Sequence, residues 1–466
     1  MLPKRPINAD VPSAEEKPPP EEKPQAPEKP EAPKAETPKA KPKAAAKAET
    51  SDEVPSPAPK KPRGTGGGAP KALVALVVLA VIFIVVAIVA GSGGDDEDSG
   101  APAPTPSSTS GEPRSKPASQ DTEALGYPSF ATNNTTRIGG SDPTANAAAA
   151  ALAVFPSTKS EQRPDAVTVV AEEDWAGAIA ASVLMAAPVR APILFSSADE
   201  VPEATEEALD ALDPQGSEAT GEAALIAIGT VSYPGEAAPV DSGDPATTAA
   251  QVATLRDRLF GEAPAHIVIA SSSHPDFAMP AAAWAARSGD PILFTEEQKL
   301  PAATAAELKK HPKVPVYVLG PSSVVSSDVV REIGQISKQV KRVSGEDPVA
   351  NALALARYRD GNFGWNVNDP GHGFVLTRSD SPANAAAAAP LSASGTWGPL
   401  LLTDNAATLP TDLRNYFLDV KPGYTTDPTR AFYNHVWVIG DQAAIDVSQQ
   451  AEVNELAELA KIGGGE

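Results

Sequence analysis

The chain has 466 residues, no cysteine and a formal net charge of −22. The lack of cysteine excludes disulfides, zinc–thiolate sites and a cysteine nucleophile, and so acidic a surface would repel nucleic acid, which is therefore not an expected partner. The chain is too long for one ordinary core, since domains typically hold roughly 100–200 residues.

Residues 1–71 consist almost entirely of Pro, Ala, Lys and Glu. Too little apolar surface is present to offset the entropy of the chain, so this segment is predicted to be a disordered arm. Proline favours extended geometry, which a partner with an aromatic groove can bind. A cytosolic partner for the arm is therefore one interpretation, and a solvated spacer is the other.

A continuous apolar stretch follows, from Ala72 to Ala90. As a helix it would span roughly 28 Å, close to the thickness of a bilayer core, so we predict a transmembrane helix and the membrane as a partner. Basic residues lie before it, between positions 60 and 71, and an acidic run, 95–98, lies after it. Basic flanks stay cytoplasmic. The sequence thus predicts a single-pass cell-membrane protein with its N-terminus inside, followed by a flexible extracytoplasmic stalk over 91–125.

An Asp-Pro pair then opens an Ala-rich segment three times, at Asp142, Asp244 and Asp347. An aspartate accepts hydrogen bonds from the free amides of a first helical turn, and proline fits the first helical position. Each pair therefore predicts the start of a helix, and their recurrence about every 100 residues predicts an internal repeat.

Short apolar runs of the buried-strand type recur between these helices in the same order. They are 167–170, 192–195 and 225–229, then 267–269, 291–294 and 316–320, then 374–376, 399–402 and 436–440. Fully apolar strands need cover on both faces, which indicates parallel sheets flanked by helices. The predicted fold class is α/β, with three tandem doubly wound (Rossmann- or flavodoxin-like) repeats. We call 126–239 the first repeat, 240–341 the second and 342–466 the third.

The opening motif Arg137-Ile138-Gly139-Gly140-Ser141-Asp142, the segment His274-Pro275-Asp276-Phe277-Ala278 and the three proline-led strands resemble the cell wall-binding repeat 2 domains of Gram-positive surface proteins. The resemblance covers roughly 137–459. It implies three doubly wound domains packed around a pseudo-threefold axis, which bind anionic secondary polymers of the wall non-covalently.

The resemblance also implies a set of polymer-binding residues in the proline-led strands and in the motifs. They are Ile193, Leu194, Ile292, Leu293, Leu400, Leu401, Arg137, Arg342 and Asp276. From their pattern alone the six strand residues would be core residues, and that alternative stays open. The second repeat departs from the motif, with Val240 in the region of the opening arginine. The acidic region would also need a local basic patch or bridging divalent cations to hold an anionic polymer.

No catalytic constellation, cofactor motif or metal-ligand spacing stands out. The five histidines, His266, His274, His311, His372 and His435, form no HExxH motif or close His–His pair, so no metal ligand is predicted. Trp365 lies in a Gly- and Asn-rich stretch, where it either stacks on a sugar or packs within its loop.

We therefore expect a membrane-anchored cell-envelope protein, not an enzyme, whose three repeats bind wall polymer. Two alternatives remain at this point: an envelope scaffold that binds other proteins, and an envelope hydrolase.

Overall fold

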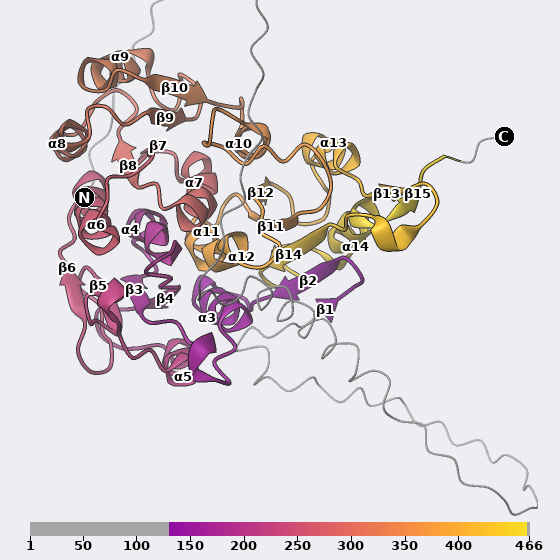
Figure 1. Ribbon diagram of the computed structural model, residues 1–466, viewed down its shortest axis with the longest axis horizontal. Helices are drawn as coiled ribbons and strands as arrows, with labels where there is room; N and C mark the ends of the chain where they lie inside the picture. Colours follow the sequence, from indigo (N-terminus) through magenta and orange to yellow (C-terminus); the bar gives the residue numbers. More distant parts are fainter. Residues whose placement is uncertain (1–129, 464–466) are drawn as a thin grey trace, which may run out of the picture. The chain divides into compact units, whose positions relative to one another are not determined.

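The computed structural model describes residues 130–463 (Figure 1). The predicted arm (1–71), transmembrane helix (72–90) and stalk (91–125) all lie outside the described residues. Within 130–463, no helix is both long and apolar enough to cross a membrane. This finding stands against the predicted single-pass membrane localisation, which we correct here and do not carry further.

Three parallel sheets of four strands form the framework, and each has the same strand order. The first contains β3 (Val167–Ala171), β4 (Ile193–Ser196), β5 (Leu225–Ile228) and β6 (Ala238–Val240), in the order β4-β3-β5-β6. The second contains β7 (Ile267–Ser271), β8 (Ile292–Thr295), β9 (Val316–Leu319) and β10 (Val340–Val343), in the order β8-β7-β9-β10. The third contains β11 (Gly373–Arg378), β12 (Leu400–Thr403), β14 (His435–Ile439) and β2 (Thr135–Ile138), in the order β12-β11-β14-β2. The α/β class with parallel sheets in repeated units is confirmed.

The third sheet takes its last strand from the other end of the described region. β2 precedes the first Asp-Pro helix, as β6 and β10 precede the second and third, yet β2 pairs in parallel with β14 of the third repeat. A short strand, β1 (Phe130–Ala131), adds antiparallel to its outer edge. Each sheet thus takes its last strand from just before an Asp-Pro helix. The first sheet takes β6, before the second such helix; the second takes β10, before the third; and the third takes β2, before the first. The predicted repeat boundaries at residues 126, 240 and 342 stay a prediction.

The Asp-Pro helices begin where the sequence predicts. They are α3 (Pro143–Val154), α6 (Pro245–Phe260) and α10 (Pro348–Arg357). In each, the aspartate before the proline is the N-cap and its carboxylate accepts from an amide of the first turn, for example from Ala145 N at 2.8 Å in α3.

Alanine-rich helices follow the first strand of each repeat and form the centre of the core. They are α4 (Trp175–Ala181) with η2 (Ser182–Met185), α7 (Pro275–Ser288), and α11 (Ala383–Ala387) with α12 (Ala389–Ala393). Figure 1 shows the three sheets arranged around them. Their alanines are buried except for Ala393, which is half-buried, and small side chains let α4, α7 and α11 pack against one another.

A proline-capped helix follows the second strand of each repeat: α5 (Glu203–Leu212), α8 (Ala302–Lys310) and α13 (Thr411–Asp419). A fourth helix follows the third strand in two repeats only, as α9 (Ser327–Ile336) and α14 (Val447–Ala457). In the first repeat, residues 229–237 join β5 to β6 without a helix. The remaining short elements are η1 (Ser160–Gln162), η3 (Glu218–Thr220), η4 (Pro428–Arg430), and the pair β13 (Gly423–Tyr424) and β15 (Ala460–Lys461).

Candidate functional site

Arg137, a predicted polymer-binding residue, is fully buried at the end of β2. Its guanidinium donates to the carbonyl oxygens of Gly440 (2.8 Å), Asp441 (2.6 Å) and Ile445 (2.5 Å), and to Gln450 Oε1 (3.0 Å). Burial lowers the pKa of Arg137 from its ordinary value, while the nearby carboxylates oppose this shift. The arginine therefore holds the turn that follows β14 against the strand taken from the first repeat.

Arg342 does the same in the second sheet with fewer bonds. It donates to Gly320 O (2.5 Å) and Val325 O (2.7 Å), in the turn that follows β9. In the first sheet, the strand register places Pro239 at this position rather than Val240. The connection from β5 to β6 has no helix-bearing turn for an arginine to hold, which explains why its loss is tolerated there. A part for Arg137 and Arg342 in polymer binding stays a prediction.

The six strand residues implied by the resemblance lie in the interior. Ile193, Leu194, Ile292, Leu293, Leu400 and Leu401 are each no more than 1% exposed. They occupy β4, β8 and β12, which belong to three different sheets, so the structure does not bring the three pairs together. The structure gives these side chains a place in the core, and their part in polymer binding stays a prediction.

Asp276 lies in the first turn of α7 and is half-buried. Its Oδ1 accepts from the backbone amide of Phe277 at 3.1 Å. None of the other eight predicted residues contacts it through a hydrogen bond or ion pair. The predicted residues thus form no single site.

A cavity of about 460 Å³ between the second and third repeats gathers aromatic side chains instead. Its wall includes Trp284 and Arg287 from α7, Trp365 from the loop after α10, and Trp397 just before β12. We call this the aromatic cavity. It joins two repeats, so neither repeat alone could form it.

The loop that carries Trp365 is fixed by its neighbours in sequence. Phe363 is fully buried and stacks on Tyr317 of β9, with ring centroids 3.5 Å apart. Gly364 has φ +94°, and a Cβ there would lie 2.3 Å from Tyr358 O, so only glycine fits. These two residues turn the third repeat's loop onto the second repeat and present Trp365 to the cavity.

The three indole rings form a continuous wall. Trp284 meets Trp365 edge to face at 5.5 Å, and Trp365 stacks on Trp397 at 6.0 Å. Trp365 is only 5% exposed, so loop packing describes most of its surface, and Trp397 is half-buried. The buried Nε1 of Trp365 has no hydrogen-bond partner, which leaves one donor without an acceptor.

Arg287 is the exposed cation among the residues that line this cavity. Its guanidinium lies 4.7 Å from the centre of the Trp397 ring, and the side chain is exposed. Among residues 130–463, no carboxylate forms an ion pair with it. The cavity therefore offers an aromatic face and an unneutralised positive charge side by side.

A buried carboxylate fixes the floor of the cavity. Asp290 accepts from Trp284 Nε1 at 2.9 Å and from the backbone amide of His266 at 2.9 Å, and it lies 3.0 Å from His266 Nδ1. Ser288 also lines the cavity, but its hydroxyl donates to Trp284 O at 2.8 Å. No hydrogen bond joins Ser288 to His266, so the three residues form no nucleophile relay of the Ser-His-Asp kind.

A second cavity, of about 210 Å³, lies at the carboxyl edge of the third sheet, where doubly wound folds bind ligands. Its cation is already neutralised: Arg378 pairs with Asp380, and this pairing lowers the pKa of the Asp380 carboxyl. Asn146 is occupied as well, since it accepts from Gly140 N and donates to Asn384. This crevice offers less to an anionic ligand than the aromatic cavity does.

The sequence pattern drew attention to Trp365 alone and did not associate Trp284, Arg287 or Trp397 with it. Tryptophan is rare in this chain, and three of its five tryptophans line this cavity, which is the one sequence feature that could have pointed to it. Without the strand register, nothing in the sequence indicated that they meet.

Residues 241–330 and 342–450 match the cell wall binding domain 2 (CWB2) family. Both sides of the aromatic cavity lie in these segments. One curated relative is the N-acetylmuramoyl-L-alanine amidase LytC of Bacillus subtilis strain 168, 27% identical over 103 residues, which are 22% of this chain and 21% of the amidase.

Two solved structures share the fold. Cwp8 from Clostridium difficile has a TM-score of 0.54 and 19% identity, over 70% of this chain and 52% of Cwp8. Cwp6 from the same organism has a TM-score of 0.55 and 20% identity, over 70% of this chain and 48% of Cwp6. This chain thus spans about half of these two structures and a fifth of the amidase.

Proposed function

We propose that this chain, whose second and third repeats are repeats of the cell wall binding domain 2 family, binds an anionic polymer of the cell wall non-covalently in the aromatic cavity. The observation that carries the proposal is the unpaired Arg287 lying on Trp397 at a cavity of about 460 Å³. This function requires the described region to be exported to the wall.

The chemistry of the cavity suits an acidic sugar polymer. The apolar face of a sugar ring packs on an indole face, as other flat or amphipathic ligands do. A phosphate or carboxylate on the polymer would pair with Arg287, whose planar guanidinium matches such groups. A polymer oxygen within the cavity would also give the Trp365 indole N–H an acceptor.

The charge of the protein makes a local site necessary. With a net charge of −22, the chain repels a polyanion at long range, and an unneutralised cation close to the ligand offsets this repulsion locally. Arg287 is such a cation, whereas Arg378 in the smaller crevice is paired with Asp380. Binding, rather than catalysis, is the activity that these groups support.

Sedimentation of the purified full chain with isolated cell walls tests the proposal. We expect Arg287→Gln to weaken binding roughly 10-fold or more, because a charge-assisted hydrogen bond is lost. The matched control is Arg331→Gln, since Arg331 is exposed on α9 and paired with Asp328. Equal binding by wild type and Arg287→Gln would contradict the proposal.

A second variant tests the aromatic face. We expect Trp397→Ala to weaken wall binding roughly 10-fold through loss of ring contact. Phe432→Ala is its control, because Phe432 is 70% exposed and lies outside the cavity. If the wild-type chain sediments with walls and loses as much from the control as from Trp397→Ala, the site lies elsewhere.

A further inference from the structure

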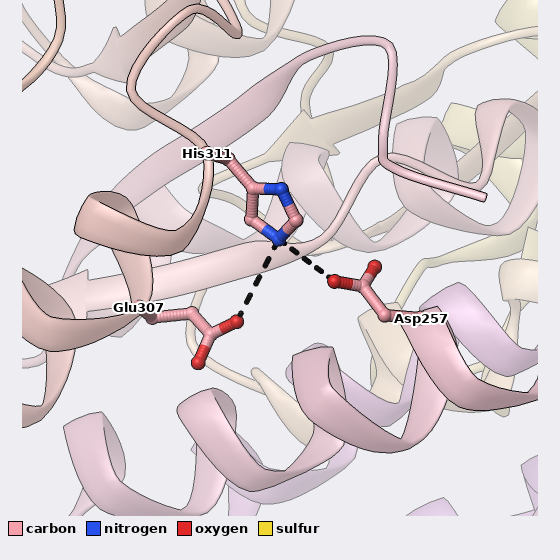
Figure 2. A group of neighbouring side chains, drawn as sticks. All are labelled: Asp257, Glu307 and His311. Carbon is pink, nitrogen blue, oxygen red and sulfur yellow. Dashed lines mark hydrogen bonds and ion pairs between the residues drawn. The ribbon is translucent and has the colours of Figure 1, made fainter.

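Three ligand-type side chains converge between α6 and α8 of the second repeat, far along the chain from the aromatic-cavity tryptophans of the third repeat. Asp257 lies on α6, Glu307 on α8, and His311 directly after α8 (Figure 2). His311 Nε2 lies 2.7 Å from Asp257 Oδ2 and 3.9 Å from Glu307 Oε1, and one ligand atom from each residue lies within 4.8 Å of the other two. We call these residues the histidine–carboxylate cluster.

Glu307 is the unusual member, because its carboxylate is almost completely removed from solvent. The residue is 3% exposed. Lys310 Nζ lies 2.6 Å from Oε2, but the buried Oε1, which faces His311, has no hydrogen-bond partner. A buried carboxylate oxygen without a partner is costly, and native proteins rarely keep one without a ligand or another compensation.

The other two repeats fill the same place with apolar or aromatic side chains. Counting six and ten residues from the capping proline of each helix, Glu307 and His311 after Pro301 correspond to Ala208 and Leu212 after Pro202. In the third repeat they correspond to Tyr416 and Val420 after Pro410. All four of these replacements are buried. The fold of the other two repeats therefore does not depend on a carboxylate and an imidazole at these positions.

We propose that Asp257, Glu307 and His311 bind one divalent transition-metal ion of the zinc type. Ligand atoms of a tetrahedral zinc site lie roughly 3.3–3.5 Å apart, given bonds of about 2.0–2.1 Å, so side-chain shifts of about 1 Å bring these three atoms to a common ion. The fourth position is left for water. An imidazole nitrogen with two carboxylates suits zinc, whereas calcium takes six to eight oxygens.

The surrounding charges leave one oxygen of each carboxylate free for the ion. Lys310 holds Glu307 Oε2, and Arg256 Nη1 lies 2.9 Å from Asp257 Oδ1. The oxygens that face His311 are the other two. The side chains of Asp257 and His311 are 24% and 13% exposed, so an ion can reach the cluster from solvent. A bound ion would join α6 to α8, which is a structural role separate from polymer binding.

Calorimetric titration of the chelator-treated full chain with Zn²⁺ tests this proposal. We expect one site, a rise in melting temperature with zinc and no comparable effect of Ca²⁺. Glu307→Gln, which keeps the shape of the side chain, and His311→Ala should each raise the dissociation constant at least about 100-fold, since changes beyond the ligands themselves already cost 10–100-fold. His274→Ala is the control, because His274 lies in the same repeat outside the cluster.

Cobalt provides a readout of ligation that does not depend on stability. Co²⁺ bound to the wild-type chain and to His274→Ala should give the same visible absorption, and His311→Ala should lose it. Far-ultraviolet circular dichroism of the metal-free variants checks that each is folded. Absence of zinc binding by the wild-type chain, or zinc binding unchanged in both cluster variants, would overturn the proposal. Neither outcome depends on whether the chain sediments with walls.

Discussion

The first and second repeats share a strand order and a Pro-capped helix, but they differ in the side chains that they place at equivalent positions. Where the second repeat has Glu307 and His311 between two helices, the first has Ala208 and Leu212. Where the second sheet has Arg342 holding a turn, the first has Pro239. The difference teaches that the Pro-capped helices and the strand order define the fold. The polar side chains at equivalent positions vary between repeats, and any binding property specific to one repeat depends on them.

The largest effect is expected at the arginine that holds a turn in the third sheet. Arg137→Met should lower the free energy of unfolding by about 3–5 kcal/mol, because the carbonyl oxygens of Gly440, Asp441 and Ile445 and the Oε1 of Gln450 each lose their hydrogen bond from the guanidinium. Arg342→Met, with two such bonds, should cost about 1–3 kcal/mol. Urea denaturation measures both.

The control for these arginines is Arg331→Met, which removes an exposed side chain and should change stability by less than about 0.5 kcal/mol. If Arg137→Met and Arg342→Met cost no more than this control, the arginines do not hold the turns, and the contrast with Pro239 loses its explanation.

An intermediate effect is expected when the second repeat is given the interior of the first. In metal-free buffer, the double variant Glu307→Ala with His311→Leu should be as stable as the wild-type chain or more stable by about 1–4 kcal/mol, since apolar replacement of buried charges commonly stabilises. With saturating zinc, the wild-type chain should become more stable than the double variant, because the ion binds only its folded state. Thermal melting with and without zinc measures this exchange; a double variant that is less stable in both conditions would show that the cluster is needed for folding itself.

The smallest effect is expected at His435, which the strand register aligns with Ala224 and Pro315, just before the equivalent strands of the other two sheets. Burial lowers the pKa of His435 below its ordinary value of 6.5. The unfolded chain therefore takes up the proton first as the pH falls below about 6.5, and the folded state loses stability until the pH reaches the lowered pKa. Unfolding at pH 7.5 and pH 5 should show a smaller loss for His435→Val than for wild type; equal losses would contradict this role.

Much of the fold could be predicted because its signals are local. Asp142, Asp244 and Asp347 each cap a helix, and the proline-led runs are buried strands, since capping and hydrophobic pattern act within a few residues. The family resemblance is supported by the match over 241–330 and 342–450.

The rest depends on contacts between distant segments. β2 pairs with β14 about 300 residues later, and no local pattern distinguishes this pairing from one with β3. Trp284 and Trp365 meet only because Phe363 anchors a loop of one repeat on another. The cluster of Asp257 with Glu307 and His311 was not predicted for the same reason: Glu307 on α8 and His311 just after it are four residues apart, but Asp257 comes from α6.

The pairing of β2 with β14 also limits how the number of repeats in such a chain can change. A stack of repeats with two open ends can lengthen or shorten by one copy, because each copy touches only its neighbours. Here the last sheet is finished by a strand from the first segment, so both ends of the series are already taken. A fourth copy would find no sheet that still lacks the strand supplied by the next repeat, and the loss of one copy would leave a sheet without that strand. Duplication of this architecture is therefore expected to proceed by whole sets of three.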